Sequence, residues 1–480
     1  MEENEQEELF KKLAKTDKVC LIAAAGCGKT HSISQALSYC DGLQLVLTHT
    51  NRGVHAIKEK LKKNKIHPGL YRVETISAFF KRYLFSYPII SGVKGLAETD
   101  ENYWDKIYEA GLNFFKTNLA KMILQNTYSG IFVDEYQDCN INQHNAILEI
   151  SKYLPVRVFG DPLQGIYDIG SNKGQLVDLD KKDQLLPGFE FFVLEEPWRW
   201  KENESLGDWL KTVRQNLING DSINLVSLPT GINFVECTKT EKDIKKRSEC
   251  LSMLSKDGTI LVIDIVDNVC HSLAKNLDGR FQSDEEIHSK DLFSFAKELD
   301  NVLDIYEAID IIFDLAAKCF TKFRTELGNF QDKLKDERHV VNSKKYPKLK
   351  EVLEKMIQGE KADNNSMIEL MNEIVSLKPG SLFRGELWRD AIRTISDSNS
   401  EEGLSFILSA CRTRSIRSIT GKPLSRKIIS RTHLVKGLEF DHVLILCPEA
   451  LNKKNLYVAL TRARKSVTIL STTSILNPRA

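Results

Sequence analysis

The stretch "LIAAAGCGKTHS", from Leu21 to Ser32, sets the first constraint on the fold. An apolar run typical of a buried strand leads into a loop of small residues, and a helical pattern follows. Small residues let the backbone N–H groups of a loop converge, so that together they can bind phosphate oxygens at the start of a helix. The stretch therefore predicts a strand, a phosphate-binding loop and a helix.

The loop ends in Gly28-Lys29-Thr30, the order found in loops that bind nucleoside triphosphates. Lys29 is expected to neutralise the β- and γ-phosphates, and the Thr30 hydroxyl to bind Mg²⁺. Ala23 stands where the strict pattern has its first glycine. We expect the remaining nucleotide contacts from Ala23, Ala24, Ala25, Gly26, Cys27 and Gly28. ATP and Mg²⁺ are the expected cofactors; a chance match without nucleotide is the alternative.

An acidic pair follows a second apolar run, in "GIFVDEYQD". Asp134 is in place to hold Mg²⁺ through water, and Glu135 to orient and deprotonate the attacking water. Such pairs are often only surface charge. The position directly after Ile131-Phe132-Val133 favours the catalytic interpretation.

Apolar runs of strand type recur along the chain. Five lie in the first half, "KVCLIAAA", "LQLVLTH", "SGIFVDE", "VRVFGD" and "FEFFVLE", and four lie later, "GTILVIDI", "RKIISRTH", "DHVLILC" and "KSVTILST". Runs that alternate with helical patterns predict parallel α/β sheets. The helical stretch between the two groups indicates an inserted domain. The predicted class is α/β with two such sheets.

Composition adds little to this. The 480 residues exceed one ordinary core, and a hydrophobic fraction of 42% with 28% charged residues is typical of a folded, water-soluble protein. Lys+Arg 67 and Asp+Glu 66 nearly cancel, so a nucleic-acid surface would need local clusters of basic residues. The 10 cysteines show no zinc spacing, and neither an apolar leader nor a membrane span is found. We expect a cytoplasmic location and no membrane partner.

In order and in wording, these motifs resemble the superfamily 1 helicases of the UvrD/Rep/PcrA type. The resemblance extends over most of the chain through "ENEQEELF", "LTHTNRGVHAI", "VETISAF", "DEYQD", "FGDPLQGIY", "LEEPWRW", "SRTHLVKGLEFDHVLIL" and "LYVALTRAR". It implies two RecA-like P-loop motor domains with mainly helical insertions, in the 1A/1B/2A/2B arrangement. The implied bounds are 1–80 and 127–187 for the first motor, 81–126 for its short insert, 188–284 and 403–480 for the second motor, and 285–402 for the larger insert.

The resemblance also implies further residues around the nucleotide. Gln6 would read the adenine, although the same segment also suits a polar helix start. Gln164 would sense the γ-phosphate, Trp198 would stack on the adenine, and Arg199 would reach the γ-phosphate. Arg462 would be the arginine finger from the second motor, with Arg464 as support and Tyr457 and Val458 packing that domain. Gly437 and Glu439 would lie near the nucleotide.

The implied DNA contacts come from both motors. They are Thr48, His49, Asn51, Arg52, Thr75, Phe79, Tyr167, Thr432, His433 and Lys436. His49 stands where the family commonly has Phe, and "DIGS" follows Tyr167 where the family usually has a further aromatic residue. Stacking on bases is therefore expected to be weaker than in the family.

A basic segment runs from Cys411 to Thr432 without any acidic residue. Its cations are Arg412, Arg414, Arg417, Lys422, Arg426, Lys427 and Arg431. In a chain of balanced charge, such a segment is a candidate track for the phosphates of a nucleic acid. An exposed basic loop is the alternative.

These features lead to three functional hypotheses. The favoured one is an ATP-dependent helicase or translocase on single-stranded and forked DNA, with 3′–5′ polarity as the resemblance implies. The second is a DNA-sensing ATPase subunit that regulates a nuclease or other effector, as in phage-defence systems such as Gabija. The third is an RNA-acting or non-translocating P-loop switch. Cys27 is expected to serve as a small residue, with redox control as its alternative.

Overall fold

The structure is a computed structural model, and it describes residues 3–96, 102–167, 176–181, 185–286, 290–338, 340–341, 344–359, 363–400, 404–420 and 425–479. The chain divides into two compact units. The first comprises Met1–Ile223, Leu451–Arg464 and Asn477–Ala480, and the second comprises Asn224–Ala450 and Lys465–Leu476. A short stretch near the C-terminus therefore belongs with the N-terminal unit.

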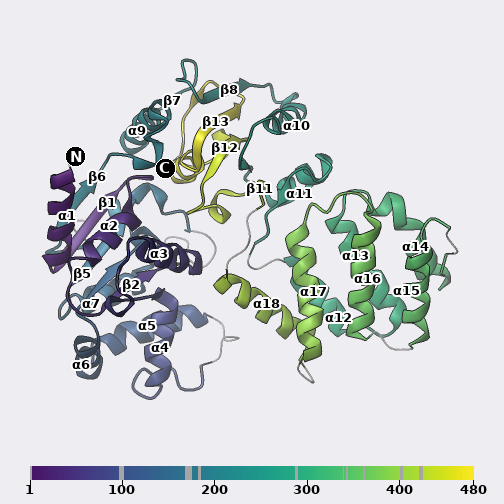
Figure 1. Cartoon of the computed structure of the whole chain (residues 1–480), viewed down its shortest axis with the longest axis horizontal. Helices are drawn as coiled ribbons and strands as arrows, with labels where there is room; N and C mark the ends of the chain where they lie inside the picture. The colour runs from purple at the N-terminus through teal and green to yellow at the C-terminus, as the bar shows by residue number, and fades with distance from the viewer. Residues whose placement is uncertain are drawn as a thin grey trace. The chain divides into compact units, whose positions relative to one another are not determined.

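A six-stranded sheet with the order β3-β2-β4-β5-β1-β6 forms the centre of the first unit (Figure 1). Its strands are β1 (Lys18–Ala23), β2 (Gln44–Thr48), β3 (Tyr71–Thr75), β4 (Gly130–Val133), β5 (Val156–Gly160) and β6 (Glu190–Leu194). Every neighbouring pair is parallel. Strands β2, β4 and β5 are buried at every residue, which explains why they read as nearly continuous apolar runs.

Helices cover both faces of this sheet, because alternate side chains of each strand point to opposite faces. Val19 and Leu21 pack with helices α1, α2 and α3, whereas Cys20 and Ile22 pack with α4, α5, α6 and α7. The helices are α1 (Glu3–Lys15), α2 (Lys29–Leu37), α3 (Asn51–Lys63), α4 (Ile76–Ser86), α5 (Tyr103–Phe115), α6 (Asn118–Thr127) and α7 (Ile141–Ile150). The last element before the second unit is α9 (Glu204–Asn219).

The first sheet extends further along the chain than the expected boundary at residue 188. Strand β6 pairs with β1 in parallel, so that Val193 lies beside Ile22 and Leu194 beside Ala23. The pairing is favoured because the half-buried side chains of Phe192 and Leu194 pack against the core beneath α1 and α2. The chain leaves the first sheet after residue 194, not before it.

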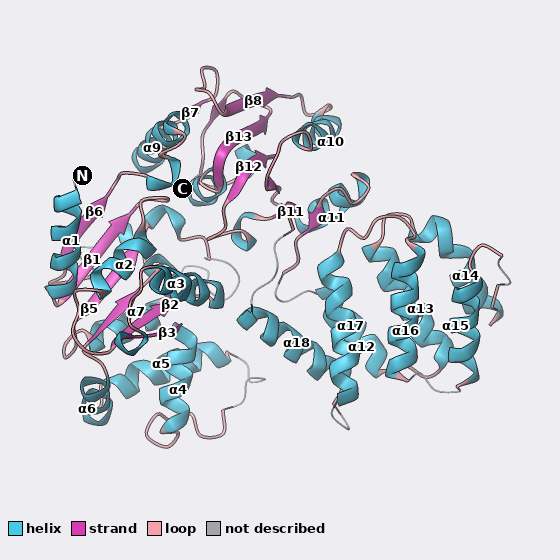
Figure 2. Ribbon diagram, viewed as in Figure 1, coloured by secondary structure: helices cyan, strands magenta, loops and turns pink. Residues whose placement is uncertain are grey.

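The second unit contains a sheet with the order β10-β11-β9-β12-β13-β8 (Figure 2). Its strands are β8 (Ile232–Glu236), β9 (Ile260–Ile263), β10 (Gln282–Ser283), β11 (Lys427–Ser430), β12 (Phe440–Ile445) and β13 (Ala463–Ser471). The pairs β10–β11, β11–β9, β12–β9 and β13–β8 are parallel. Helices α10 (Lys242–Met253) and α11 (Asp267–Asn276) pack on it, and β7 (Ile223–Asn224) pairs with β14 (Ile475–Leu476). The α/β class with two sheets is confirmed.

A helical bundle is inserted between β10 and β11. Its helices are α12 (Lys290–Asp300), α13 (Ile305–Cys319), α14 (Phe323–Glu337), α15 (Pro347–Gln358), α16 (Asn364–Leu377), α17 (Gly385–Ser400) and α18 (Phe406–Thr420). The bundle continues past the expected end at residue 402, because Ala410 of α18 is buried in its core. In the described part of the chain, no helix has the length and apolar character needed to cross a bilayer.

One buried ion cluster joins this bundle to the second sheet. Arg384 donates to both carboxylate oxygens of Glu285, at 2.6 and 2.8 Å, and to Asp291 at 2.7 Å. Burial lowers the pKa of Arg384, but Glu285 and Asp291 raise it by a larger amount, so the net pKa is raised and the guanidinium remains charged. Since Glu285 follows β10 and Arg384 directly precedes α17, the cluster ties the segment that enters the bundle to the start of α17.

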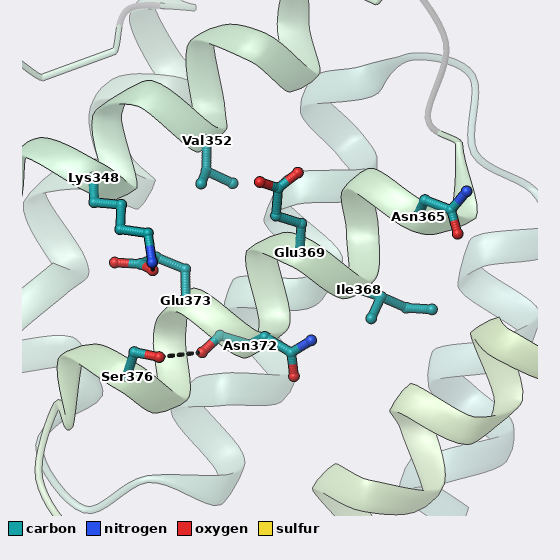
Figure 3. Close-up of a pocket in the computed structure, with 8 residues that line it drawn as sticks. All are labelled: Lys348, Val352, Asn365, Ile368, Glu369, Asn372, Glu373 and Ser376. Atoms are coloured by element: carbon teal, nitrogen blue, oxygen red, sulfur yellow. Dashed lines mark hydrogen bonds and ion pairs between the residues drawn. The ribbon is translucent and has the colours of Figure 1, made fainter.

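The bundle also carries a surface hollow of about 320 Å³ (Figure 3). It is lined by Lys348, Val352, Asn365, Ile368, Glu369, Asn372, Glu373 and Ser376, from α15 and α16. Lys348 and Glu373 form an ion pair of 3.0 Å there. None of these residues is an expected ATP or DNA contact.

Candidate nucleotide and DNA site

The phosphate loop connects β1 to α2 at the carboxyl edge of the first sheet. Gly26 (φ 77°) and Gly28 (φ 88°) have left-handed backbone conformations, which glycine adopts without strain. A Cβ atom on Gly26 would lie 3.0 Å from the Arg199 Cβ and 3.0 Å from the Trp200 ring. The Arg199 N–H donates to the Gly26 carbonyl oxygen at 3.2 Å. The loop therefore lies directly against the segment that carries Arg199.

Lys29 lies at the start of α2 and has only 9% of its surface exposed. Its Nζ is 3.3 Å from Glu135 Oε1. Burial lowers the pKa of Lys29, but Glu135, Asp161 and Asp134 raise it by more, so the net pKa is above its ordinary value. The lysine is thus held in its charged form beside the loop, as a phosphate contact requires.

The acidic pair follows β4. Asp134 is 4% exposed, and its Oδ1 accepts from the Glu135 N–H at 3.0 Å. Glu135 has a left-handed backbone (φ 55°), which is costly for a residue with a side chain and often marks a functional site. Thr30 and Asp134 supply oxygen ligands, the type that Mg²⁺ prefers. Thr30 and Asp134 would therefore hold a magnesium ion, which would neutralise negative charge on the phosphates.

Gln164 ends the short helix η3 (Pro162–Gln164), which follows β5. Its Nε2 donates to Asp161 Oδ2 at 2.7 Å, and the Asp161 N–H donates to Gln137 Oε1 at 3.0 Å. The Gln137 Nε2 donates in turn to Glu135. A chain of hydrogen bonds thus runs from the acidic pair to the expected γ-phosphate sensor.

The segment after β6 supplies an aromatic ring and an arginine. Trp198 begins η6 (Trp198–Trp200), is 41% exposed and lies near Gly28. The Lys201 Nζ lies 3.4 Å from the centroid of the Trp198 ring. The Arg199 Nη1 donates to the Thr461 carbonyl oxygen at 2.8 Å. The structure therefore brings the predicted Trp198 and Arg199 together with the phosphate loop.

Arg462 follows α19 (Lys453–Leu460) and is 2% exposed. Its Nε donates to the Val458 carbonyl oxygen at 2.9 Å, and its Nη2 to the Thr461 hydroxyl at 3.1 Å. Arg464, two residues later, is exposed. Arg462 is therefore an oriented, buried cation, whereas Arg464 faces solvent.

The origin of Arg462 differs from the expectation that it comes from the second motor. Leu451–Arg464 belongs to the first compact unit, together with the phosphate loop. The Ala25 N–H donates to the Tyr457 hydroxyl at 3.1 Å, and the Trp200 Nε1 donates to the Ala463 carbonyl oxygen at 2.7 Å. Tyr457 therefore packs on the phosphate loop, a contact that the sequence-based prediction did not include.

Cys27 lies inside the loop with 2% of its surface exposed, and burial raises the pKa of its thiol to about 12. A thiol in this state is almost entirely protonated at neutral pH and reacts slowly with oxidants. We predict that the Cys27→Ser variant retains ATPase activity. We also predict that the variant and the wild-type protein lose the same fraction of this activity on treatment with peroxide. Selective protection by Cys27→Ser would contradict this. Cys411, which is exposed, offers the matched control variant Cys411→Ser.

The expected DNA contacts of the first unit lie at the ends of β2 and β3. Thr48 is 1% exposed, and the His49 Nε2 is 3.5 Å from the Cys139 Sγ. Asn51 and Arg52 form the first turn of α3 and are half-buried. The Thr75 hydroxyl accepts from the Ala78 N–H at 3.1 Å and caps α4. These residues share one edge of the sheet, where open α/β sheets bind their ligands.

Phe79 does not fit this group. Its ring is fully buried and stacks on Phe115 with a centroid distance of 5.3 Å, edge-on to Phe80 and Tyr83. A fully buried ring offers no face to a base. The ring faces inward because Phe79 lies on the apolar side of the amphipathic helix α4, beside the buried Phe80 and Tyr83. The structure therefore makes Phe79 a core residue of the small helical insert.

Two further expectations concern the ends of the site. Tyr167 is half-buried, and burial together with Asp138 and Glu135 raises its pKa above the ordinary range. The "DIGS" segment that follows, residues 168–171, lies outside the described residues. Gln6 is half-buried on α1.

The second unit holds the other expected contacts in the loop after β11. Thr432 is 4% exposed, and the His433 Nε2 lies 3.7 Å from Glu286 Oε1. Burial and the nearby Arg431 lower the pKa of His433 despite Glu286, so the ring is mostly neutral at neutral pH. Lys436 is half-buried, Gly437 is exposed with φ 78°, and Glu439 is exposed.

The basic segment is largely neutralised. Arg414 is 4% exposed and pairs with Asp390 at 2.9 Å and Glu386 at 3.5 Å, and Arg417 pairs with the same two carboxylates. Arg431 pairs with Glu286 and with Asp267. The remaining cations are Arg412 and Arg426, which are exposed, Lys427, which is half-buried, and Lys422, which lies outside the described residues. The expected phosphate track is therefore reduced to a few side chains, because α18 packs its arginines into the bundle.

The sequence-based prediction did not include Arg214, and it assigned Tyr457 only to packing of the second motor. Arg214 on α9 pairs with the buried Asp161 at 2.7 Å, and the Tyr457 hydroxyl binds the loop. A single arginine in an amphipathic helix carries no local signal of function. Only the position of Tyr457 in "LYVALTRAR" could have indicated its nearness to the site.

Comparisons with known proteins match two parts of the chain. The AAA domain family matches residues 6–169, and the UvrD-like helicase C-terminal domain family matches residues 428–470. One of the ATP-dependent helicase/nuclease subunits of Alkaliphilus metalliredigens (strain QYMF) is 23% identical over 229 residues. That alignment covers 42% of this chain and 18% of the relative, so the chain spans a small part of that protein.

Solved structures of helicases also show similarity. The Pif1 helicase from Candida albicans is 12% identical with a TM-score of 0.41, covering 99% of this chain and 96% of that chain. Arterivirus nonstructural protein 10 (helicase) with DNA is 10% identical with a TM-score of 0.34, covering 96% of this chain and 62% of that chain. The two family matches lie at opposite ends of the chain, around the phosphate loop and around Arg462. The chain is therefore similar to the AAA domain family in its N-terminal part and to the UvrD-like helicase C-terminal domain family near its other end.

Proposed function

We propose that the protein hydrolyses ATP to move along single-stranded DNA, with 3′–5′ polarity, and to separate duplex strands. The observation that carries the proposal is the set of charges around the phosphate loop. The Lys29 Nζ lies 3.3 Å from Glu135, Arg199 lies against the phosphate loop, and Arg462 is a buried cation of the same compact unit. Phosphoryl transfer depends mainly on positioning and on charge stabilisation, and this arrangement suits both.

Each residue has a separate part in this mechanism. Lys29 binds the phosphates as a charged ammonium, and Thr30 and Asp134 would hold Mg²⁺, which supplies charge neutralisation at the phosphates. Glu135 orients the attacking water and accepts its proton. Arg462 stabilises the negative charge that develops on the transferred phosphoryl group. Trp198 stacks on the adenine, and Gly437 and Glu439 remain proposed contacts of the nucleotide.

The DNA contacts are part of the same proposal. Asn51 and Arg52 lie at the N-terminus of α3, where backbone N–H groups also favour phosphate oxygens. His433 and Lys436 are the matching candidates in the second unit. Closure driven by nucleotide would move one group of contacts relative to the other, and this is how hydrolysis would become movement. The proposal retains a cytoplasmic location.

The direct test is to measure ATP hydrolysis with single-stranded DNA, tailed duplex and blunt duplex, and to read strand separation in the same reactions. We predict that single-stranded DNA raises the rate by about tenfold or more, because the DNA contacts and the ATP site share one sheet edge. Turnover that stays flat across the DNA titration would contradict the proposal. Duplexes with either a 3′ or a 5′ tail resolve the polarity.

A second candidate function is a DNA-sensing ATPase subunit that regulates a nuclease or another effector. Two observations favour it: Phe79 is buried, and the arginines Arg414 and Arg417 are neutralised within the bundle. Both reduce the surface available to grip DNA strongly. A stoichiometric nuclease in the purified native complex, with ATPase activity that responds to DNA but no strand separation, would favour this function over the motor.

A further inference from the structure

Arg214 on α9 makes an ion pair with Asp161, which lies three residues before Gln164. Its Nη1 donates to Asp161 Oδ1 at 2.7 Å, and the side chains are 16% and 0% exposed. Burial lowers the pKa of Arg214, but Asp161 and Tyr457 raise it above the ordinary value. A carboxylate that is fully removed from water needs such a partner, because an unpaired buried charge is strongly destabilising. Arg214 is therefore bound to its place by Asp161.

The second oxygen of Asp161 fixes the orientation of Gln164. Oδ2 accepts from the Gln164 Nε2 at 2.7 Å. An ionised carboxylate only accepts hydrogen bonds, so Gln164 must turn its NH₂ group, and not its oxygen, toward Asp161. The Asp161 N–H is bound to Gln137, so the backbone at this point is held as well. The orientation of the Gln164 side-chain amide, the expected γ-phosphate sensor, therefore depends on the position of Asp161.

Arg214 also contacts Tyr457, and Tyr457 in turn binds the phosphate loop. The guanidinium carbon lies 5.3 Å from the centroid of the Tyr457 ring, within the range of a cation–π contact. The Tyr457 hydroxyl accepts from the Ala25 N–H at 3.1 Å, and Tyr457 is 2% exposed. Arg214 thus contacts both Asp161, which binds Gln164, and Tyr457, which binds the phosphate loop at Ala25.

We propose that Arg214 is a positioning residue for ATP hydrolysis, which holds Gln164 through Asp161 and the phosphate loop through Tyr457 in one common geometry. The inference rests on the proposed ATPase function. Arg214 itself need not touch the nucleotide. Its removal would release Gln164 and Ala25 together, and small errors of position around the reacting phosphate are costly in rate.

Steady-state kinetics of Arg214→Gln, together with ADP binding, test the proposal. We expect kcat for ATP to fall by about 100-fold, while the affinity for ADP changes by less than about threefold, because ADP has no γ-phosphate to misplace. Arg214→Lys should recover part of kcat, since it restores a charge beside Asp161 without the planar group. Lys211→Gln, an exposed charge change one turn earlier on α9, is the matched control and should behave as wild type.

A double-mutant cycle tests whether the contributions of Arg214 and Tyr457 to kcat are coupled. Tyr457→Phe removes the hydroxyl that binds the Ala25 N–H but keeps the ring near Arg214, and it should lower kcat by itself. If Arg214 and Tyr457 act as one unit, the double variant loses less than the product of the two single losses.

Three results would overturn the inference. The first is a kcat for Arg214→Gln within about twofold of wild type. The second is a parallel loss of kcat and of ADP affinity, which would indicate general damage to the fold. The third is a loss of kcat in the double variant that equals the product of the two single losses. A wild-type protein without ATPase activity, with or without DNA, would overturn the proposed function itself. The two failures are therefore distinct.

Discussion

Arg462→Gln should lower the DNA-stimulated rate of ATP hydrolysis by about 10³-fold or more, the range in which an arginine finger acts. Arg462 is buried, and bonds to Val458 and Thr461 orient its guanidinium. The replacement removes the charge that stabilises the transition state and leaves Lys29 to bind the phosphates. Affinities for ADP and for single-stranded DNA should therefore change by less than about threefold. Single-turnover hydrolysis and binding titrations measure these quantities.

Arg464 provides the matched control for Arg462. It lies two residues away, carries the same charge and is exposed. Arg464→Gln should retain hydrolysis close to wild type. Thermal unfolding of both variants shows whether loss of the buried hydrogen bonds has damaged the fold. Equal losses in the two variants, or turnover that survives in Arg462→Gln, would mean that the C-terminal arginine does not serve the ATP site.

Glu135→Gln should slow hydrolysis by about 10²- to 10⁴-fold, the contribution of a general base. The change keeps the size of the side chain and its hydrogen bond to Gln137, but it removes the carboxylate that accepts the proton of water. ATP affinity should remain or increase, because the negative charge 3.3 Å from the Lys29 Nζ is lost and the lysine is released for the phosphates. Rapid-quench measurement of hydrolysis and nucleotide binding give the two values.

Glu149→Gln is the control for this experiment. Glu149 lies on α7 in the same unit, is half-buried, and pairs with the exposed Lys152. Its replacement should leave hydrolysis unchanged. If Glu135→Gln hydrolyses ATP at the wild-type rate, the water must be activated by another group, and the assignment of the acidic pair fails.

The local motifs were accessible to sequence reasoning because each is a contiguous backbone feature. The phosphate loop needs glycine at two left-handed positions, and the acidic pair needs an apolar strand before it. Both features involve residues that are adjacent in the sequence. The α/β class followed from the same runs. Domain edges were less accessible, because β6 and α18 join their neighbours through contacts distant in the chain.

Charge and aromatic residues show the limit of this reasoning most clearly. The segment around Arg414 reads as a free basic track, yet Glu386 and Asp390, on the neighbouring helix α17, neutralise it. Phe79 reads as a DNA contact, yet Phe115 covers it. In each case, a partner from another helix decides between exposure and burial, and no spacing in the sequence records that partner.

The sequence by itself determined the class of the fold, the phosphate loop, the acidic pair and the order of the motifs, because these depend on local backbone geometry and on the spacing of apolar residues. Only the tertiary structure decided which cations remain exposed and which unit holds Arg462. It alone brought Tyr457 to the Ala25 N–H and Arg214 to Asp161. The physical reason is that a hydrogen bond or an ion pair acts over a few ångströms of space, however many residues of chain separate its partners.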